Sequence, residues 1–481
     1  MAEAGAYDQY DNPLVTRYAS REMSAIFSPQ RKFSTWRRLW LALAECERDL
    51  GLPITEAQLD EMRAHLDDIN FAAAEELEAQ LRHDVMAHIH AFAAQCPTAK
   101  PIIHLGATSC YVTDNADLMA MRDGLGLLRA RLVNLIAALA AFARQHRALV
   151  TLGFTHFQPA QPTTVGKRAC LWLYDFVLDH EEVVRLAEWL PFRSVKGTTG
   201  TQDSFLALFE GSHAKVRRLE RAIARKMGFR RVVPVSGQTY TRKIDTLVLN
   251  ALVGIAQSAA KMSNDLRLLQ HLQEVEEPFE KGQVGSSAMP HKRNPMRCER
   301  MGSLARHLIA TALNAPLTAA TQWLERTLDD SAGRRIAIPE AFLAADAILS
   351  IALNVARGLV VHPQVIAAHL RREAPFMATE RVLMAAVKAG GDRQRLHERL
   401  RHHAWEVRQR MADEGADNDL PERLKADDAF AAVRDRIDDL TRGDGLAGRA
   451  PQQVDEFLRT VVQPILKAEA KLLGLESKLT R

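Results

Sequence analysis

The sequence has few cysteines and few signs of a disulfide or redox protein. Its 481 residues include five cysteines, at positions 46, 96, 110, 170 and 298, which are widely spaced and form no Cys-x-x-Cys pair. An odd and scattered set of this kind excludes a disulfide framework and favours an intracellular protein with reduced thiols. The chain also lacks the P-loop pattern, which excludes that glycine-rich phosphate loop.

Charge of one sign is not in large excess. The chain carries 63 basic and 59 acidic residues, with a formal net charge of +4. A nucleic-acid-binding protein usually has a stronger and more segregated basic surface, so we expect no nucleic-acid partner. A balanced chain can still gather the few cations that a small anionic ligand needs.

Long apolar runs are scarce as well. Residues 1–20 contain no apolar core of signal-peptide length, and no run of about 18 uncharged apolar residues occurs elsewhere. We therefore expect no membrane partner and a cytoplasmic protein.

Aromatic residues make up only 6% of the chain, while alanine and leucine are abundant, a composition that favours helix. Apolar residues recur every three or four positions over long stretches. They predict helices over about 113–146, 164–190 and from Gly237 to about 269, and two more over 295–324 and from Arg335 to 361. Thr113-Asp114-Asn115 is a candidate N-terminal cap, and Pro339 is expected in the first turn of the last helix.

Helices of this length cannot bury their apolar faces singly, so they are expected to form a bundle. The prediction is an all-α fold with three helical domains. Residues 1–108 form an N-terminal helical domain, residues 109–361 the central long-helix bundle, and residues 362–481 a C-terminal helical domain.

Residues 282–295 differ from the helical pattern around them. Gly282 and Gly285 give the backbone freedom, and Pro290 and Pro295 oppose regular helix. Two adjacent serines and a lysine lie in the same segment. A flexible loop with hydroxyl groups near one end and cations near the other suits chemistry on an anion.

This loop resembles the signature loop of the fumarase/aspartase superfamily, roughly Gly-Ser-Ser-x-Met-Pro-x-Lys-x-Asn. Within that superfamily the chain resembles the adenylosuccinate lyase family, in its longer, animal-type branch. The resemblance covers nearly the whole chain. It rests on Arg17-Tyr18, Arg82-His83-Asp84, Gly106-Ala107-Thr108-Ser109, Gly153 to Thr164, Gly237-Gln238, the signature loop, Lys388-Ala389-Gly390-Gly391 and Gly448 to Gln453. One departure is His291, where that branch is expected to have tyrosine.

The resemblance implies the three-domain plan and a homotetramer whose active sites are shared between subunits. It implies anti β-elimination of fumarate from adenylosuccinate, giving AMP, and from the succinyl-carboxamide ribotide SAICAR, giving AICAR. Neither reaction needs a cofactor, and the substrate is a small anionic nucleotide.

Such an elimination requires a base that takes a proton from carbon and an acid that protonates the departing nitrogen. His156 is the only side chain of 153–164 that exchanges a proton near neutral pH, and the resemblance implies that it is the general acid. We expect this segment to be a loop between helices, because it contains Pro159 and Pro162. The resemblance implies that Ser286 is the base, although chemistry alone does not separate it from Ser287.

The substrate contacts come from the resemblance alone, position by position. Five arginines and several hydroxyl and amide side chains would meet two carboxylates and a phosphate. These predicted contacts are Arg17, Tyr18, Arg82, His83, Asp84, Thr108, Ser109, Thr155, Gln238, Lys292, Asn294, Arg300, Arg326, Ser331 and Arg335.

A metal site is not expected. His83, His88 and His90 are near each other in the chain, but their spacings of five and two residues do not place them on one helix face.

Two other functions remain open at this point. A sister lyase of the same superfamily, such as argininosuccinate lyase, fumarase or aspartase, shares the loop but is not expected to contain both Arg17-Tyr18 and Arg82-His83-Asp84. A catalytically silent relative would have no need to keep His156, Ser286 and Lys292 together.

Overall fold

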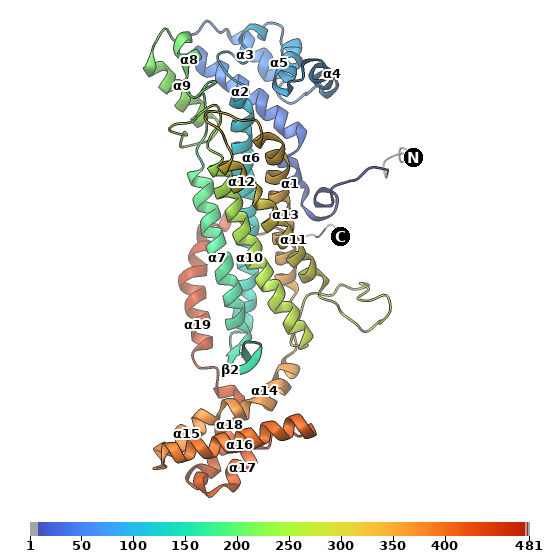
Figure 1. Ribbon diagram of the computed structural model, residues 1–481, viewed down its shortest axis with the longest axis vertical. Coiled ribbons are helices and arrows are strands. Elements are labelled where there is room, and N and C mark those ends of the chain that lie inside the picture. Colours follow the sequence, from blue (N-terminus) through green and yellow to red (C-terminus); the bar gives the residue numbers. More distant parts are fainter. Residues whose placement is uncertain (1–7, 477–478, 480–481) are drawn as a thin grey trace.

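The computed structural model describes residues 8–476 and residue 479, and helices make up most of them (Figure 1). The predicted all-α fold is confirmed. Within these described residues, strands form two short antiparallel pairs, one of β1 (Val150–Thr155) with β2 (Gln158–Thr164) and one of β3 (Val275–Glu276) with β4 (Val360–Val361).

Five long helices form the central bundle. They are α6 (Cys110–Gln145), α7 (Val165–Trp189), α10 (Lys243–His271), α11 (Met296–Ala312) and α13 (Asp330–Gly358). Their inward faces carry leucine, isoleucine and alanine side chains that are almost fully buried in one continuous core. Burial of this apolar face, at about 25 cal/mol per Å², is what holds the helices together.

Shorter helices close one end of the bundle, the upper end in Figure 1. They are α2 (Pro29–Asp49), α3 (Glu56–Ala64), α4 (Phe71–Leu81), α5 (Asp84–Gln95), α8 (Asp203–Leu208) and α9 (His213–Lys226). The short helices η1 (Leu14–Tyr18) and α1 (Arg21–Ile26) precede them. Residues 1–7, part of the stretch in which no signal peptide is expected, lie outside the described residues.

The C-terminal helices lie at the other end of the bundle (Figure 1). They are α14 (Pro363–Met377), α15 (Thr379–Lys388), α16 (Arg393–Glu414), α17 (Leu420–Ala426) and α18 (Ile437–Thr441), and most of them surround a second apolar core. The chain then returns to the bundle through α19 (Ala450–Phe457) and α20 (Gln463–Ala468), where Val454 and Leu458 join the main core. The domain boundaries at 108 and 361 stay predictions.

The expected cap of the first long helix is wrong. The helix α6 begins at Cys110, three residues before Thr113, and Asp114 and Asn115 are buried within it. The Asp114 carboxylate accepts a hydrogen bond from Arg242, and the Asn115 amide oxygen accepts one from the backbone of Ser194. These two side chains bind partners from other segments instead of the free amides of their own helix.

Two other helix boundaries differ from the prediction. The segment 295–324 is divided at Leu313 into α11 and α12 (Asn314–Ala320). The last long helix begins at Asp330, so Pro339 lies inside it and not in its first turn. Asp330 is buried against Arg242, and this ion pair holds the start of α13 earlier than the apolar pattern indicates.

Residues 153–164 form a hairpin, not the predicted loop between helices. Strand β1 pairs with β2 in a register that places Phe154 opposite Pro159 and Leu152 opposite Pro162, with an irregularity between Leu152 and Phe154. A two-stranded ribbon consists of edge strands only, and an edge strand tolerates proline because its missing amide can face away from the partner.

Two helices, α6 and α13, are long and apolar enough to cross a membrane by length and composition. Their most apolar windows are 61% and 83% buried inside the protein. Their hydropathy therefore has an explanation in the packing of the bundle core.

Candidate functional site

The structure brings several predicted site residues together near the start of α6. His83 caps the first turn of α5, and its Nε2 lies 3.4 Å from the hydroxyl of Ser109, which precedes α6. The amide of Gln238 donates to the Thr108 hydroxyl over 3.5 Å. Four side chains from three distant segments of the chain thus share one end of the bundle.

The same end of the bundle carries an ion pair between two predicted contacts. The Arg335 guanidinium donates to the Asp84 carboxylate over 2.6 Å, although 251 residues separate them. Burial acts to raise the pKa of Asp84, but the hydrogen bond and charge of Arg335 outweigh it and lower that pKa below its usual value. Asp84 is therefore a carboxylate at neutral pH, and Arg335 is partly neutralised by it.

Three more predicted contacts lie at this end. Arg326 pairs with Asp330 at 2.8 Å, and Ser331 follows Asp330 in the first turn of α13. Arg82 ends α4 in the left-handed conformation, with φ of 54°, and its side chain is exposed.

His156 lies at the opposite end of the bundle, in the two-residue turn of the β1–β2 hairpin. Both turn residues have positive φ, 54° for His156 and 58° for Phe157. A turn of this type favours asparagine and glycine, so a histidine and a phenylalanine here carry backbone strain of about 1 kcal/mol each. Thr155 precedes the turn, and all three side chains are exposed.

The signature loop lies apart from both groups, to the side of the bundle (Figure 1). The Ser286 hydroxyl accepts hydrogen bonds from the backbone amides of Ala288 and Met289, at 3.3 and 3.1 Å. The Asn294 amide donates to the carbonyl of Gly285 over 2.8 Å. A side chain at Gly285 would collide with the Lys292 carbonyl, because its Cβ would lie 2.0 Å from that oxygen. The loop is thus closed on itself by contacts between Gly285 and the segment that contains Lys292.

Arg17, Tyr18 and Arg300 form a fourth group. The guanidinium carbon of Arg300 lies 5.6 Å from the centre of the Tyr18 ring, and that of Arg17 lies 6.0 Å from it. Cations at these distances from an aromatic ring are weakly attracted to it.

The predicted residues therefore do not form one site within a single chain. Ser109 and His156 are separated by the 36 residues of α6, roughly 54 Å of helix. Gln238 and the signature loop are separated by the 29 residues of α10, roughly 43 Å. One substrate molecule could touch all of these groups only if different copies of the chain supplied them.

A buried charge network that lies next to Gln238 in the structure was not predicted. Arg242 pairs with Asp114 at 3.0 Å and with Asp330 at 2.7 Å, and all three side chains are at most 2% exposed. The adjacent Arg334 pairs with Asp245 at 2.7 Å and donates to the Tyr240 hydroxyl. The network joins the starts of α6, α10 and α13, and so fixes the segments that carry Ser109, Gln238 and Arg326.

One signal for this network was present in the sequence. Asp114 lies four residues before Leu118, the first member of the apolar stripe of α6, and so on the same helix face. A carboxylate on a core-facing position predicts a buried cation partner. The partner, Arg242, could not have been chosen from the many arginines of the chain.

Among residues 8–476 and 479, no three His, Cys, Asp or Glu side chains are grouped so that they could hold a metal ion. His88 is buried and stacks on Phe33 with ring centres 3.6 Å apart. Its role in the described structure is packing.

Comparison with known proteins agrees with this architecture. Residues 53–309 match the family described as lyase, and residues 375–457 match the family described as adenylosuccinate lyase C-terminus. The fold is similar to that of a fumarate lyase from Mesorhizobium, with a TM-score of 0.80 at 24% identity, over 94% of this chain and 100% of that one. It is also similar to 3-carboxy-cis,cis-muconate lactonizing enzyme from Pseudomonas putida, with a TM-score of 0.82 at 21% identity, over 94% and 100% of the two chains.

Relatives that match over almost their full length show the family to which the chain belongs. The chain is 52% identical to adenylosuccinate lyase of Saccharomyces cerevisiae and 50% identical to that of Schizosaccharomyces pombe, in both cases over 98% of each chain. It is 47% identical to that of Schistosoma mansoni, over 98% of this chain and 99% of the relative. The all-helical bundle and the signature loop define a lyase of the fumarase type. The chain belongs to the adenylosuccinate lyase family, in agreement with the resemblance to its longer, animal-type branch.

Proposed function

We propose that this protein eliminates fumarate from adenylosuccinate, giving AMP, and from SAICAR, giving AICAR. The observation that carries the proposal is the 52% identity to a yeast adenylosuccinate lyase over 98% of both chains, together with the intact signature loop. Both reactions break a carbon–nitrogen bond and leave a double bond in fumarate. Neither requires a cofactor.

We infer that His156 is the acid and Ser286 the base. The exposed hairpin turn presents His156 to a ligand that binds outside its own chain, and a histidine can donate a proton to the departing nitrogen near neutral pH. Ser286 would take a proton from the carbon beside a carboxylate, and the charge of Lys292 supports the oxyanion that such a base requires. Closure of the glycine-containing loop on substrate would bring these groups together.

The remaining predicted contacts are proposed to hold the two carboxylates and the phosphate. His83, Thr108, Ser109 and Gln238 already lie together, and Arg326 and Arg335 are on the same end of the bundle. Hydroxyl and amide groups suit the succinyl carboxylates, and arginine forks suit the phosphate.

We propose that the working enzyme is a homotetramer with shared active sites. The separation of Ser109 from His156 along α6 supports it, because one chain cannot close a site around a small substrate. An exposed apolar stripe on α7 supports it too, since Leu171, Tyr174 and Leu178 recur at helical spacing and are 47 to 50% exposed. Such a stripe suits contact with another copy of the bundle.

We further propose that the enzyme works in the cytosol. All five cysteines are free and buried, as expected where thiols stay reduced.

Ultraviolet absorbance of the purified protein mixed with adenylosuccinate tests the function, with argininosuccinate as the matched control. We expect the adenylosuccinate spectrum to change to that of AMP, with one fumarate recovered per AMP. Fumarate released only from argininosuccinate would support an elimination that forms fumarate, but it would contradict adenylosuccinate as the substrate.

A further inference from the structure

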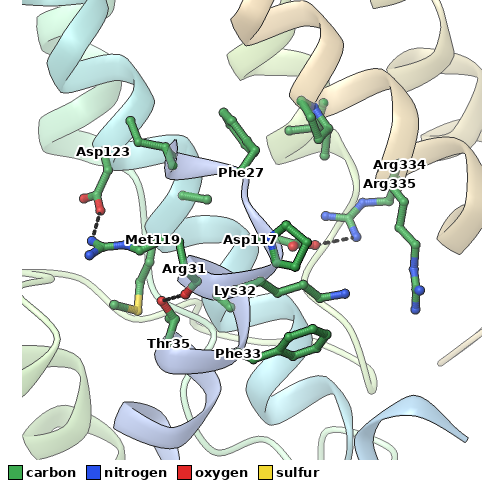
Figure 2. Close-up of a pocket in the computed structure, with 16 residues that line it drawn as sticks. Phe27, Arg31, Lys32, Phe33, Thr35, Asp117, Met119, Asp123, Arg334 and Arg335 are labelled. Carbon is green, nitrogen blue, oxygen red and sulfur yellow. Dashed lines mark hydrogen bonds and ion pairs between the residues drawn. The ribbon is translucent and has the colours of Figure 1, made fainter. Parts of the chain in front are cut away.

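A cavity that shares only Arg335 with the predicted substrate contacts opens between the N-terminal helices and the bundle. Its volume is about 280 Å³, and its walls come from the junction of α1 and α2, the first turns of α2, the first third of α6 and the first half of α13 (Figure 2). This volume is close to the lower end of small-ligand sites, about 300 Å³.

Most of the wall is apolar. Phe27 and Pro29 enter from the α1–α2 junction, Met119 and Ala120 from α6, and Ile338 from α13. Figure 2 shows the Phe33 ring beside the Lys32 side chain and the Phe27 ring farther from it. A flat ring system fits walls of this kind, because aromatic and aliphatic faces bury it without leaving polar groups unpaired.

Every charged side chain of the wall except one is in an ion pair. Arg31 pairs with Asp123 at 2.8 Å and Arg334 with Asp117 at 2.9 Å. Arg335 also lines the cavity, and it pairs with Asp84, which does not.

The exception is Lys32, which forms no ion pair with any part of the chain that the structure describes. Its ammonium is half-buried and lies 5.2 and 5.0 Å from the ring centres of Phe33 and Trp36. Burial, and next the charge of Arg335, lower the pKa of Lys32, and the carboxylates of Asp117, Asp84 and Glu78 only partly offset them. A negative charge brought next to this ammonium would relieve both effects.

We propose that this cavity is a second binding site, specific for a small aromatic monoanion whose carboxylate pairs with Lys32 and whose ring lies between the apolar walls. A dianion or a phosphate would bring more negative charge than the single unpaired cation, Lys32, can neutralise. The site goes beyond the proposed lyase function and does not depend on it. It adjoins the predicted substrate group only through Arg335.

Titration calorimetry of the full-length protein with 2-naphthoate tests the proposal, with the neutral 2-naphthamide as matched ligand. We expect naphthoate to bind at least about tenfold more tightly than naphthamide, which is the gain of one charge-assisted contact. Lys32→Met should reduce naphthoate binding to the level of naphthamide, and Lys32→Arg should preserve most of it. Equal affinity for the two ligands, no binding, or binding that K32M does not change would overturn the proposal.

A second variant locates the site. Ala120→Phe fills the cavity without changing its charge, and we expect it to abolish binding of both ligands while the thermal midpoint stays near that of the wild type. Its KM for adenylosuccinate should be unchanged. Loss of naphthoate binding together with a raised KM would show that the cavity is part of the substrate site, and would overturn the proposal of a separate one. Because binding is measured without turnover, this test gives its result even if the proposed lyase function is wrong.

Discussion

Ser109 and His156 stand at opposite ends of α6, with all 36 residues of that helix between them. Ser109 precedes its first turn and His156 lies in the hairpin that follows its last. Roughly 54 Å of helix is several times the length of a nucleotide, so two residues that are both predicted to meet the substrate cannot do so within one chain.

Replacing His156 by asparagine should separate catalysis from stability. Asparagine accepts the positive φ of this turn more readily than histidine does, but it exchanges no proton near neutral pH. We expect His156→Asn to lose nearly all turnover while the free energy of unfolding stays equal or rises by up to about 1 kcal/mol. Phe157→Asn is the control, since it relieves the same kind of strain. Wild-type turnover in H156N would remove His156 from the acid role.

The two adjacent serines of the signature loop can be told apart by a matched pair of variants. Ser286→Ala should abolish turnover and still bind adenylosuccinate, whereas Ser287→Ala should keep much of the activity. Ser286 also accepts two backbone hydrogen bonds, so binding must be measured beside turnover to detect a disturbed loop. Loss of turnover in S287A alone would assign the base to Ser287.

The fold class and the long helices could be predicted because the apolar stripes are long and regular. Residues 153–164 were misjudged because proline opposes strand in general, and only the pairing shows that both prolines lie in an edge strand. The cap at Thr113 and the start of α13 were misplaced for another reason. Asp114 and Asp330 are held by Arg242, a partner that no local pattern identifies.

The candidate site was predictable only as a set of residue types. The motifs predicted which side chains contact the substrate. The structure then places His83 beside Ser109 and Thr108 beside Gln238. Local spacing contains no information on distances across α6 or α10, so the separation of the groups could not be derived from the motifs themselves.

Removal of Arg242 should be strongly destabilising. It is 1% exposed and pairs with two carboxylates that are equally buried. We expect Arg242→Met to lower the free energy of unfolding by about 3–5 kcal/mol, because the buried Asp114 loses its ion-pair partner and the buried Asp330 keeps only Arg326. Arg38→Met, which breaks an exposed pair with Asp67, should cost less than about 1 kcal/mol in the same denaturant titration. Similar costs for both would show that the buried network is not a stability determinant.

Glu47 should make the folded protein less stable as the pH rises. Both carboxylate oxygens are buried without a hydrogen-bond partner, and burial raises the pKa of Glu47 to about 9. The unfolded-state pKa is about 4.3, so the folded protein holds a proton that the unfolded chain releases between these values. The stabilising contribution is therefore complete below about pH 4 and is lost as pH rises toward 9.

Glu47→Gln has the same shape and does not titrate. We expect its stability relative to the wild type to increase steadily from pH 5 to pH 9, by roughly 5 kcal/mol in total, at about 1.4 kcal/mol per pH unit. Thermal midpoints measured across that range would show it. A difference between the two proteins that is constant with pH would contradict a protonated Glu47.

Mixing two inactive variants tests whether the active site is shared between copies of the chain. His83→Ala alters the group at the start of α6 and His156→Asn the hairpin at its end. Each should be nearly inactive with adenylosuccinate when purified alone. After joint dissociation and reassembly, hybrid oligomers should contain some sites with both groups intact, up to about a quarter of all sites. Activity that appears only in the mixture is the predicted result. Hybrid oligomers that form but stay as inactive as their parents would contradict a site built from several chains.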